Sequence, residues 1–212
     1  MAGRRFPGWF VVFEGGDGVG KSTQVELLSD ALADADIAHL VTREPGGTVL
    51  GDAIRELLLN PDSGDVSPRA EALLYAADKA QHLHEVVMPA LAAGKVVVCD
   101  RYLDSMLAYQ GAGRVLELRE VAAVADWATE GLLPDLTVLL DLDPERAVGM
   151  KQNKDRLEQA GAQFHRRVRE GFLDLANAEP DRYLVLPGRQ GRERTAGLVR
   201  QRLRELGVPL ID

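Results

Sequence analysis

The sequence predicts a three-layer α/β fold, in which helices cover both faces of a five-stranded parallel sheet. Two observations lead to this fold class. Five short apolar runs alternate along the chain with longer amphipathic stretches, and this βαβα order is typical of parallel sheets. Several of the runs are apolar at every position rather than at every second one, which a strand buried on both faces requires.

The predicted strands are short, and long segments separate them. They cover residues 9–13, 38–42, 95–100, 136–141 and 183–186. The segments between them are long enough to return the chain to the same edge of the sheet through a helix, as parallel pairing demands. We therefore expect helices as the main connections.

The predicted helices follow from apolar side chains at helical spacing. In the first, Val25, Leu28 and Leu32 form one stripe. The second is rich in alanine and leucine, and we expect Pro89 to interrupt it because proline removes a backbone donor. The four helices are predicted at residues 21–35, 68–93, 117–130 and 193–206.

The bulk composition limits the classes of partner. The 212 residues suit a single domain over 1–212, and 46% hydrophobic residues can form a core. The net charge of −8 argues against long nucleic acid, although a local cluster of arginine and lysine could receive a small anion. The one cysteine, Cys99, excludes a disulfide framework. No apolar run approaches the length of a membrane span or a signal peptide, so we expect a cytoplasmic protein.

A glycine-rich segment follows the first strand and matches the phosphate-loop pattern G-x-x-x-x-G-K-[ST]. Its glycines allow the backbone to approach phosphate groups, and the following helix directs its positive dipole end at them. Lys21 would reach the β- and γ-phosphates, and Ser22 would bind Mg²⁺. The ATP-binding residues are therefore predicted as Gly15, Gly16, Asp17, Gly18, Val19, Gly20, Lys21, Ser22 and Thr23.

A second polar motif stands at the end of the third strand. Asp100 and Arg101 come directly after an apolar run, and ligands of open parallel sheets gather at the carboxyl ends of the strands. Asp100 can support Mg²⁺, directly or through water, and Arg101 can hold a phosphate in a bidentate manner. The alternative for this pair is a structural ion pair.

Together these motifs resemble those of bacterial thymidylate kinases, a family of P-loop nucleoside monophosphate kinases. The resemblance spans about residues 9–186. Its most diagnostic part is the run Thr-Arg-Glu-Pro-Gly-Gly-Thr at residues 42–48. The other matching segments are residues 13–23, Asp-Arg-Tyr at 100–102, Ala-Tyr-Gln-Gly at 108–111 and Gly-Leu-Leu-Pro-Asp-Leu-Thr at 131–137.

The resemblance implies an activity: transfer of the γ-phosphoryl group of Mg-ATP to dTMP, giving dTDP for dTTP biosynthesis. It implies that Asp17 lies near the sugar 3′-hydroxyl and the metal ion, and that Arg101 holds the acceptor phosphate with help from Arg55. It places Pro45, possibly after a cis peptide bond, beside the sugar. It further implies a stacking position on the base for Tyr75, and closure of the nucleoside pocket by Tyr109 and Gln110. The acceptor-binding region is about residues 43–85.

The resemblance also implies a homodimer and a mobile lid. The dimer would pack through helices that include residues 68–93. The lid would cover about residues 144–158, exclude water and supply an arginine to the transferring phosphoryl group. Arg156 is the lid arginine that fits the family pattern, and Lys151 or Lys154 could assist it.

Departures from the family pattern concern base recognition and the lid. Lys79 stands where an arginine usually donates to a base carbonyl, and Lys lacks the planar fork of Arg. Met106 follows Ser105 where a polar residue usually reads the base. Ser105, Gln110 or a water molecule could take over that contact. Met150 falls where a lid arginine is common.

These departures leave alternative functions open. One is a kinase for a 5-modified deoxyuridylate or another pyrimidine monophosphate. Others are an ATP-binding regulator without phosphotransfer and a catalytically silent paralogue, which would bind ATP without forming ADP when an acceptor is added.

Overall fold

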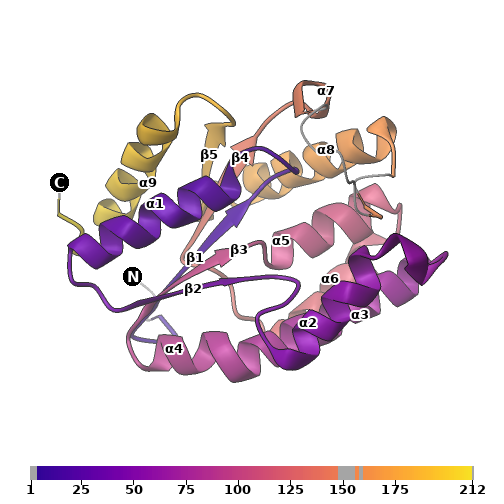
Figure 1. Ribbon diagram of the computed structural model, residues 1–212, viewed down its shortest axis with the longest axis horizontal. Coiled ribbons are helices and arrows are strands. Elements are labelled where there is room, and N and C mark those ends of the chain that lie inside the picture. Colours follow the sequence, from indigo (N-terminus) through magenta and orange to yellow (C-terminus); the bar gives the residue numbers. More distant parts are fainter. Residues whose placement is uncertain (1–3, 148–155, 158–159, 212) are drawn as a thin grey trace.

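The fold is known from a computed structural model, which describes residues 4–147, 156–157 and 160–211. Five strands form one sheet in the order β2-β3-β1-β4-β5, and every neighbouring pair is parallel (Figure 1). This confirms the predicted fold class. The strands are β1 Trp9–Glu14, β2 His39–Arg43, β3 Val96–Asp100, β4 Leu136–Asp141 and β5 Tyr183–Pro187.

The sheet is covered on both faces, and its strands contribute alternate side chains to two separate cores. On β1, Phe10 and Val12 pack into one core, whereas Val11 and Phe13 pack into the other. Helices α1 and α9 cover the face of Val11, and the remaining long helices cover the face of Phe10 (Figure 1). Burial on both faces explains why β1 is apolar throughout.

The helices begin where the chain supplies a cap or the phosphate loop. Thr48 caps α2 by accepting a hydrogen bond from the Gly51 amide at 2.9 Å, and Ser67 caps α3 just before Pro68. The helices are α1 Lys21–Asp34, α2 Val49–Leu59, α3 Pro68–His82, α4 Met88–Ala92, α5 Leu103–Met106, α6 Leu118–Thr129, α7 Pro144–Ala147, α8 Ala162–Ala178 and α9 Arg192–Leu206.

The long helix expected over 68–93 is interrupted, but the irregularity begins before Pro89. A π-helical turn over Leu83–Val87 joins α3 to α4, and the Met88 amide donates to the Leu83 carbonyl, five residues back. Pro89 has no amide to donate to the Glu85 carbonyl four residues earlier, and the wider turn takes up that mismatch. A second π-helical turn, Leu107–Gly113, continues α5 toward the site.

Among the described helices, none combines the length and the apolar character needed to cross a membrane.

Candidate active site

The phosphate loop connects β1 to α1 and takes a conformation that only glycine allows at its first position. Gly15 has a φ of 129°, and a Cβ there would lie 2.4 Å from the Leu140 carbonyl oxygen of the neighbouring strand β4. Lys21, the first residue of α1, folds back over the loop. Its Nζ donates to the Gly15 carbonyl at 3.1 Å and to the Gly16 carbonyl at 2.7 Å.

Lys21 is buried, and its charge is destabilised by its surroundings. Burial and the nearby Arg101 guanidinium lower the pKa of Lys21 to about 8, although Asp17 and Asp100 oppose the shift. An ammonium group in this state has a strong preference for an anionic ligand, because added negative charge would restore its usual pKa.

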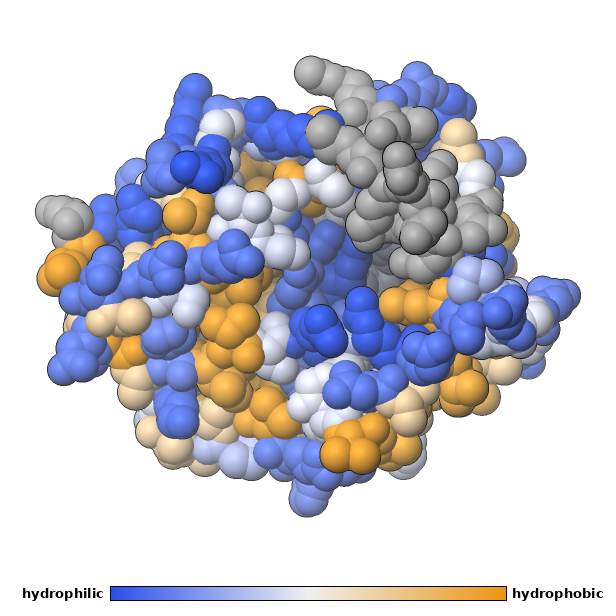
Figure 2. Space-filling view, in the orientation of Figure 1, coloured by the Kyte–Doolittle hydropathy of each residue, from blue (hydrophilic) through white to orange (hydrophobic). Residues whose placement is uncertain are grey.

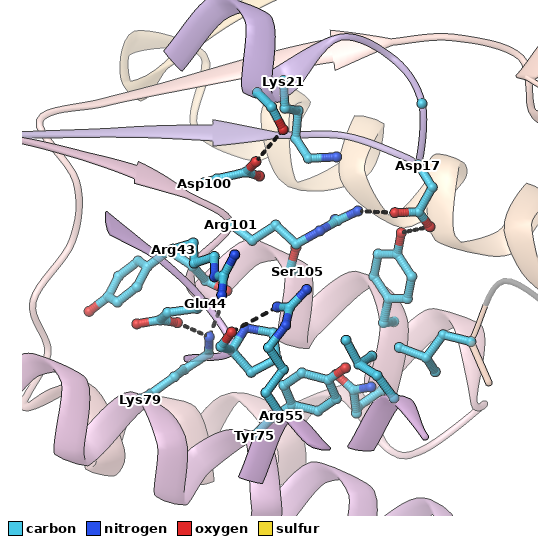
Figure 3. Close-up of a pocket in the computed structure, with 18 of the residues that line it drawn as sticks. Asp17, Lys21, Arg43, Glu44, Arg55, Tyr75, Lys79, Asp100, Arg101 and Ser105 are labelled. Atoms are coloured by element: carbon cyan, nitrogen blue, oxygen red, sulfur yellow. Dashed lines mark hydrogen bonds and ion pairs between the residues drawn. The ribbon is translucent and has the colours of Figure 1, made fainter. Parts of the chain in front are cut away.

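Arg101 is the cation at the centre of the site. It follows β3 with a φ of 69°, an unusual backbone for arginine, and this conformation turns its side chain across the phosphate loop (Figure 3). Its Nη1 donates to the Gly15 carbonyl at 3.0 Å and to the Ser105 hydroxyl at 3.1 Å. Its Nη2 donates to the Asp17 carboxylate at 2.7 Å. The Asp-Arg motif thus joins the phosphate loop to α5.

Asp17 is held ionised next to this guanidinium. Burial would raise the pKa of Asp17, but Arg101 and Lys21 outweigh it and lower that pKa to about 2. Tyr109 donates its hydroxyl to the other carboxylate oxygen of Asp17 at 3.3 Å, and burial raises the pKa of this phenol well above its usual value. Asp17 is therefore a fixed negative charge with two oriented partners.

Glu14, which the sequence reasoning missed, sets the position of the Asp-Arg turn. This buried carboxylate accepts hydrogen bonds from the Tyr102 amide at 2.9 Å, the Ser105 amide at 3.0 Å and the Ser105 hydroxyl at 2.6 Å. Burial, with Asp104 next in effect, raises the pKa of Glu14. The sequence did carry one signal for this role, because Glu14 is a charged residue at the end of an otherwise apolar strand. A carboxylate buried there needs several hydrogen-bond donors.

Most of the predicted site residues line one cavity of about 480 Å³, a size that suits a nucleotide-sized ligand, whereas Gly15, Gly16, Val19, Met106 and Arg156 do not line it. In Figure 2 the cavity is a hollow at the centre of the view, and its inner surface is hydrophilic. The site residues predicted from the sequence that line it are Asp17, Gly18, Gly20, Lys21, Ser22, Thr23, Pro45, Arg55, Tyr75, Lys79, Asp100, Arg101, Ser105, Tyr109 and Gln110. Arg43, which belongs to the diagnostic run at residues 42–48 but had no predicted role, also lines it.

The loop between β2 and α2 forms one wall of the cavity. The Glu44–Pro45 peptide bond is cis, as suggested from the sequence. Arg55 Nη1 donates to the Pro45 carbonyl at 2.8 Å, so this guanidinium is tied to the loop and still borders the cavity (Figure 3). Tyr75 reaches the same wall from α3 and is largely buried.

Lys79 differs from the expectation that it would face the base. Its side chain is 2% exposed and its ammonium pairs with Glu44, whose side chain is 1% exposed. The same ammonium donates to the Tyr102 carbonyl at 2.8 Å, and His82 holds the second oxygen of Glu44 at 2.8 Å. Lys79 borders the cavity, and its charge neutralises that of Glu44. A buried carboxylate attracts the nearest cation because each alone would be costly to bury.

Met106 does not line the cavity, which corrects the expectation that it would contact the base. Met106 is the last residue of α5, is 1% exposed and packs into the core on the Phe10 face of the sheet. Because α5 turns the adjacent position toward Glu14 and Arg101, Ser105 faces the site and Met106 faces the core.

Arg156 does not join the phosphate loop, contrary to the expectation from the family pattern. Its guanidinium forms an ion pair with buried Glu71, and its Nε donates to the Leu58 carbonyl at 2.9 Å. Arg114 and Gln110 also donate to Glu71, at 3.0 Å and 2.9 Å. Glu71 therefore binds Arg156, Arg114 and Gln110 together.

The rest of the lid is only partly described. Asp143 caps the start of α7 by accepting a hydrogen bond from the Glu145 amide at 2.9 Å. The predicted lid residues Met150, Lys151 and Lys154 lie outside the described residues.

Of the three residues predicted to bind a metal ion, Ser22 and Asp100 are in contact. The Ser22 hydroxyl donates to Asp100 Oδ2 at 3.2 Å, and Asp17 lines the same cavity. In the described part of the chain, no group of three or more histidine, cysteine, aspartate or glutamate side chains is arranged to hold a metal. Any ion here would need further ligands, such as phosphate oxygens.

The family model, the relatives and the solved structure that match this chain all belong to one family. Residues 13–196 match the family model described as thymidylate kinase. The chain is 62% identical over 196 residues to a Cutibacterium acnes protein named thymidylate kinase, covering 92% of this chain and 96% of that protein. A Clavibacter michiganensis protein of the same name is 54% identical, with 94% and 96% covered. The crystal structure of thymidylate kinase from Ehrlichia chaffeensis superimposes with a TM-score of 0.77 at 30% identity, covering 92% of this chain and 98% of that one.

Proposed function

We infer the roles of the site residues from one premise: the chain belongs to the thymidylate kinase family and transfers the γ-phosphoryl group of ATP to dTMP, giving dTDP. The comparisons do not favour a kinase for a 5-modified deoxyuridylate or a non-catalytic ATP-binding regulator. Of the two residues that motivated the first alternative, Met106 does not line the cavity, and the ammonium of Lys79 is paired with Glu44 and the Tyr102 carbonyl.

We propose that the phosphate loop over residues 15–23 holds the donor triphosphate. Its amides and the start of α1 form an anion site, and Lys21 can exchange the Gly15 and Gly16 carbonyls for the β- and γ-phosphates. The lowered pKa of Lys21 supports this role because phosphate charge would stabilise the protonated ammonium.

The observation that carries the acceptor assignment is the position of Arg101. Its guanidinium contacts a phosphate-loop carbonyl on one side and Ser105 on the other, and so stands between donor and acceptor spaces. We propose that it binds the dTMP phosphate, with Arg55 assisting. Asp17 would accept from the sugar 3′-hydroxyl, Pro45 and Tyr109 would enclose the sugar, and Tyr75 would stack on the base. Ser105 and Gln110 would complete the pocket.

The reaction then requires positioning and charge stabilisation, with no proton transfer. A phosphate oxygen of dTMP attacks the γ-phosphorus, a new P–O bond forms, and the bond from the γ-phosphorus to the β,γ-bridging oxygen breaks with its electron pair leaving on ADP. The acceptor phosphate is already ionised near pH 7, so it needs no general base. Lys21 and Arg101 stabilise the charge that develops on the transferred group.

The donor set fits Mg²⁺. Ser22, Asp100 and Asp17 offer hard oxygen ligands at the phosphate loop, and Asp17 is ionised across the physiological range. Mg²⁺ usually keeps several waters and phosphate ligands, so a site with few protein ligands suits it. When bound, the ion would neutralise phosphate charge.

We propose one kinase domain over residues 1–212 that forms a homodimer. Support for the dimer comes from apolar side chains left exposed on α2, α3 and α6: Leu57 is 54% exposed, Leu73 59% and Trp127 83%. Sedimentation of the parent and of Leu73→Glu tests this, and a monomeric parent would refute it. Location in the cytoplasm stays a prediction from the sequence.

The acceptor assignment is tested by measuring ADP release with Mg-ATP and dTMP. Arg101→Ala removes charged hydrogen bonds of about 1.5–3 kcal/mol each, so kcat/KM for dTMP should fall by about a hundredfold or more. Arg69→Ala, which removes an exposed arginine paired with Glu120, is the matched control. An Arg101→Ala variant within threefold of the parent would refute the role of this residue, and a parent inactive on dTMP would refute the substrate.

A further inference from the structure

Arg189 lies outside every predicted motif and far along the sequence from the phosphate loop, yet its side chain contacts that loop. Arg189 lies in the turn between β5 and α9, 171 residues from its partner Gly18. Its Nη2 donates to the Gly18 carbonyl at 2.9 Å, and its Nε approaches the same oxygen at 3.3 Å. A Cβ built on Gly18 would lie 3.5 Å from Nη2, so the guanidinium rests directly against this peptide.

The turn that carries Arg189 is fixed at both ends. The Gly188 amide donates to the Asp141 carbonyl at the end of β4 at 2.6 Å. Gln24 of α1 donates to the Arg192 carbonyl at 3.0 Å. Arg189 itself has a φ of 61°, a left-handed conformation that is uncommon for a residue with a side chain. Because this backbone conformation is unfavourable and both ends of the turn are held, we infer that the contact between Arg189 and Gly18 fixes the position of the turn.

The contact has a consequence for the opposite side of the same peptide. In a trans peptide the carbonyl and the following amide point in opposite directions. Holding the Gly18 oxygen against Arg189 therefore directs the Val19 amide away from Arg189, toward the side on which the loop amides would meet phosphate.

We propose that Arg189 is a positioning residue for the donor nucleotide, which orients the Gly18–Val19 peptide so that the Val19 amide binds a donor phosphate. The proposal rests on the phosphate loop being the donor site. Glycine at position 18, with a φ of 69°, leaves this peptide free to rotate. Arg189 removes that freedom before ATP arrives, and so lowers the entropic cost of binding.

The test compares Arg189→Ala and Arg189→Lys with Arg192→Ala as the matched control. Arg192 carries the same charge three residues away, and its side chain is 75% exposed beside Glu193. We expect Arg189→Ala to raise KM for ATP and Kd for ADP and inorganic pyrophosphate about tenfold, which corresponds to about 1.4 kcal/mol. KM for dTMP and kcat should stay within threefold, Arg189→Lys should recover part of the loss, and Arg192→Ala should match the parent.

A direct readout comes from the amide of Val19. In ¹⁵N-labelled protein, its resonance should shift on adding pyrophosphate to the parent, and shift less in Arg189→Ala. Unchanged pyrophosphate affinity in Arg189→Ala would overturn the proposal. So would equal rises in KM for ATP and dTMP with a lower melting temperature, since these indicate a general structural role. Pyrophosphate binding needs no turnover, so this result is separate from the activity of the parent on dTMP, which tests the substrate.

Discussion

Replacing Lys79 by methionine separates two roles for this residue, a buried counter-ion and a reader of the base. The side chains of Lys79 and Glu44 are 2% and 1% exposed, and removing one partner of a buried ion pair costs about 3–5 kcal/mol. His82 keeps its hydrogen bond to Glu44, which favours the lower end, about 3 kcal/mol. For a chain of this size such a loss lowers the melting temperature by about 6–12 °C.

The assay combines stability with substrate choice. Urea unfolding gives the free energy of unfolding, and kcat/KM is measured for dTMP and dCMP. We expect Lys79→Met to lose stability while the ratio of the two kcat/KM values stays within threefold. The double variant Glu44→Gln/Lys79→Met should regain part of the loss, because it leaves no unpaired charge. Lys95→Met, at the opposite end of β3 from the site, is the matched control.

The converse result would contradict the role of Lys79 as a counter-ion. If Lys79→Met unfolds at the same urea concentration as Lys95→Met, and its preference for dTMP over dCMP falls tenfold or more, then Lys79 reads the base.

The remaining predictions concern four other residues. Burial, with the Glu44 charge next in effect, raises the pKa of Asp78 to about 7, so the folded state keeps a proton that the unfolded chain releases above about pH 4. The free energy of unfolding should therefore fall between pH 4 and pH 7, and Asp78→Asn should flatten this profile and gain at most about 4 kcal/mol at pH 8; an unchanged profile in urea titrations would contradict this. We propose that the protonated form of Lys21 binds phosphate, so kcat/KM for ATP should decline above about pH 8, and a flat profile to about pH 9.5 would contradict a lowered pKa for this lysine. Met106→Ser should cost about 3 kcal/mol of stability and leave the preference for dTMP unchanged, and the opposite pattern would return Met106 to the pocket. Arg156→Ala should lower the melting temperature because it removes a partner of buried Glu71; a large loss of kcat at unchanged stability would instead support a catalytic role.

Much of the fold could be predicted from the sequence because each strand or helix carries its own pattern of apolar residues. Strand β1 is apolar at every position, and α1 has a single apolar stripe, so each element carries its own pattern. The predicted strand and helix bounds agree with the structure to within one or two residues. The helix expected over 68–93 was the exception, because a π-helical turn depends on how Pro89 is accommodated rather than on apolar spacing.

The site was predicted in part for the same reason. The phosphate loop and the Asp100–Arg101 pair are continuous motifs, and the sheet brings them together because both follow the carboxyl ends of neighbouring parallel strands. Glu14 was missed because its partners, Tyr102 and Ser105, come 88 and 91 residues later. A carboxylate that serves as a buried anchor looks the same in a sequence as one in solvent.

The sequence by itself determined the parallel sheet, the phosphate loop and the membership of a kinase family, since these depend on residue patterns over a few turns or strands. Only the tertiary structure decided where the long charged side chains point. Lys79 turns to Glu44, Arg156 to Glu71 and Arg189 to Gly18, and each pair is at least 35 residues apart. A flexible cation can reach several places from one backbone position. Lys79 and Arg156 settle where a buried carboxylate would otherwise lack a partner, and Arg189 settles at a carbonyl of the exposed Gly18; in each case the partner's place depends on the packing of the whole chain.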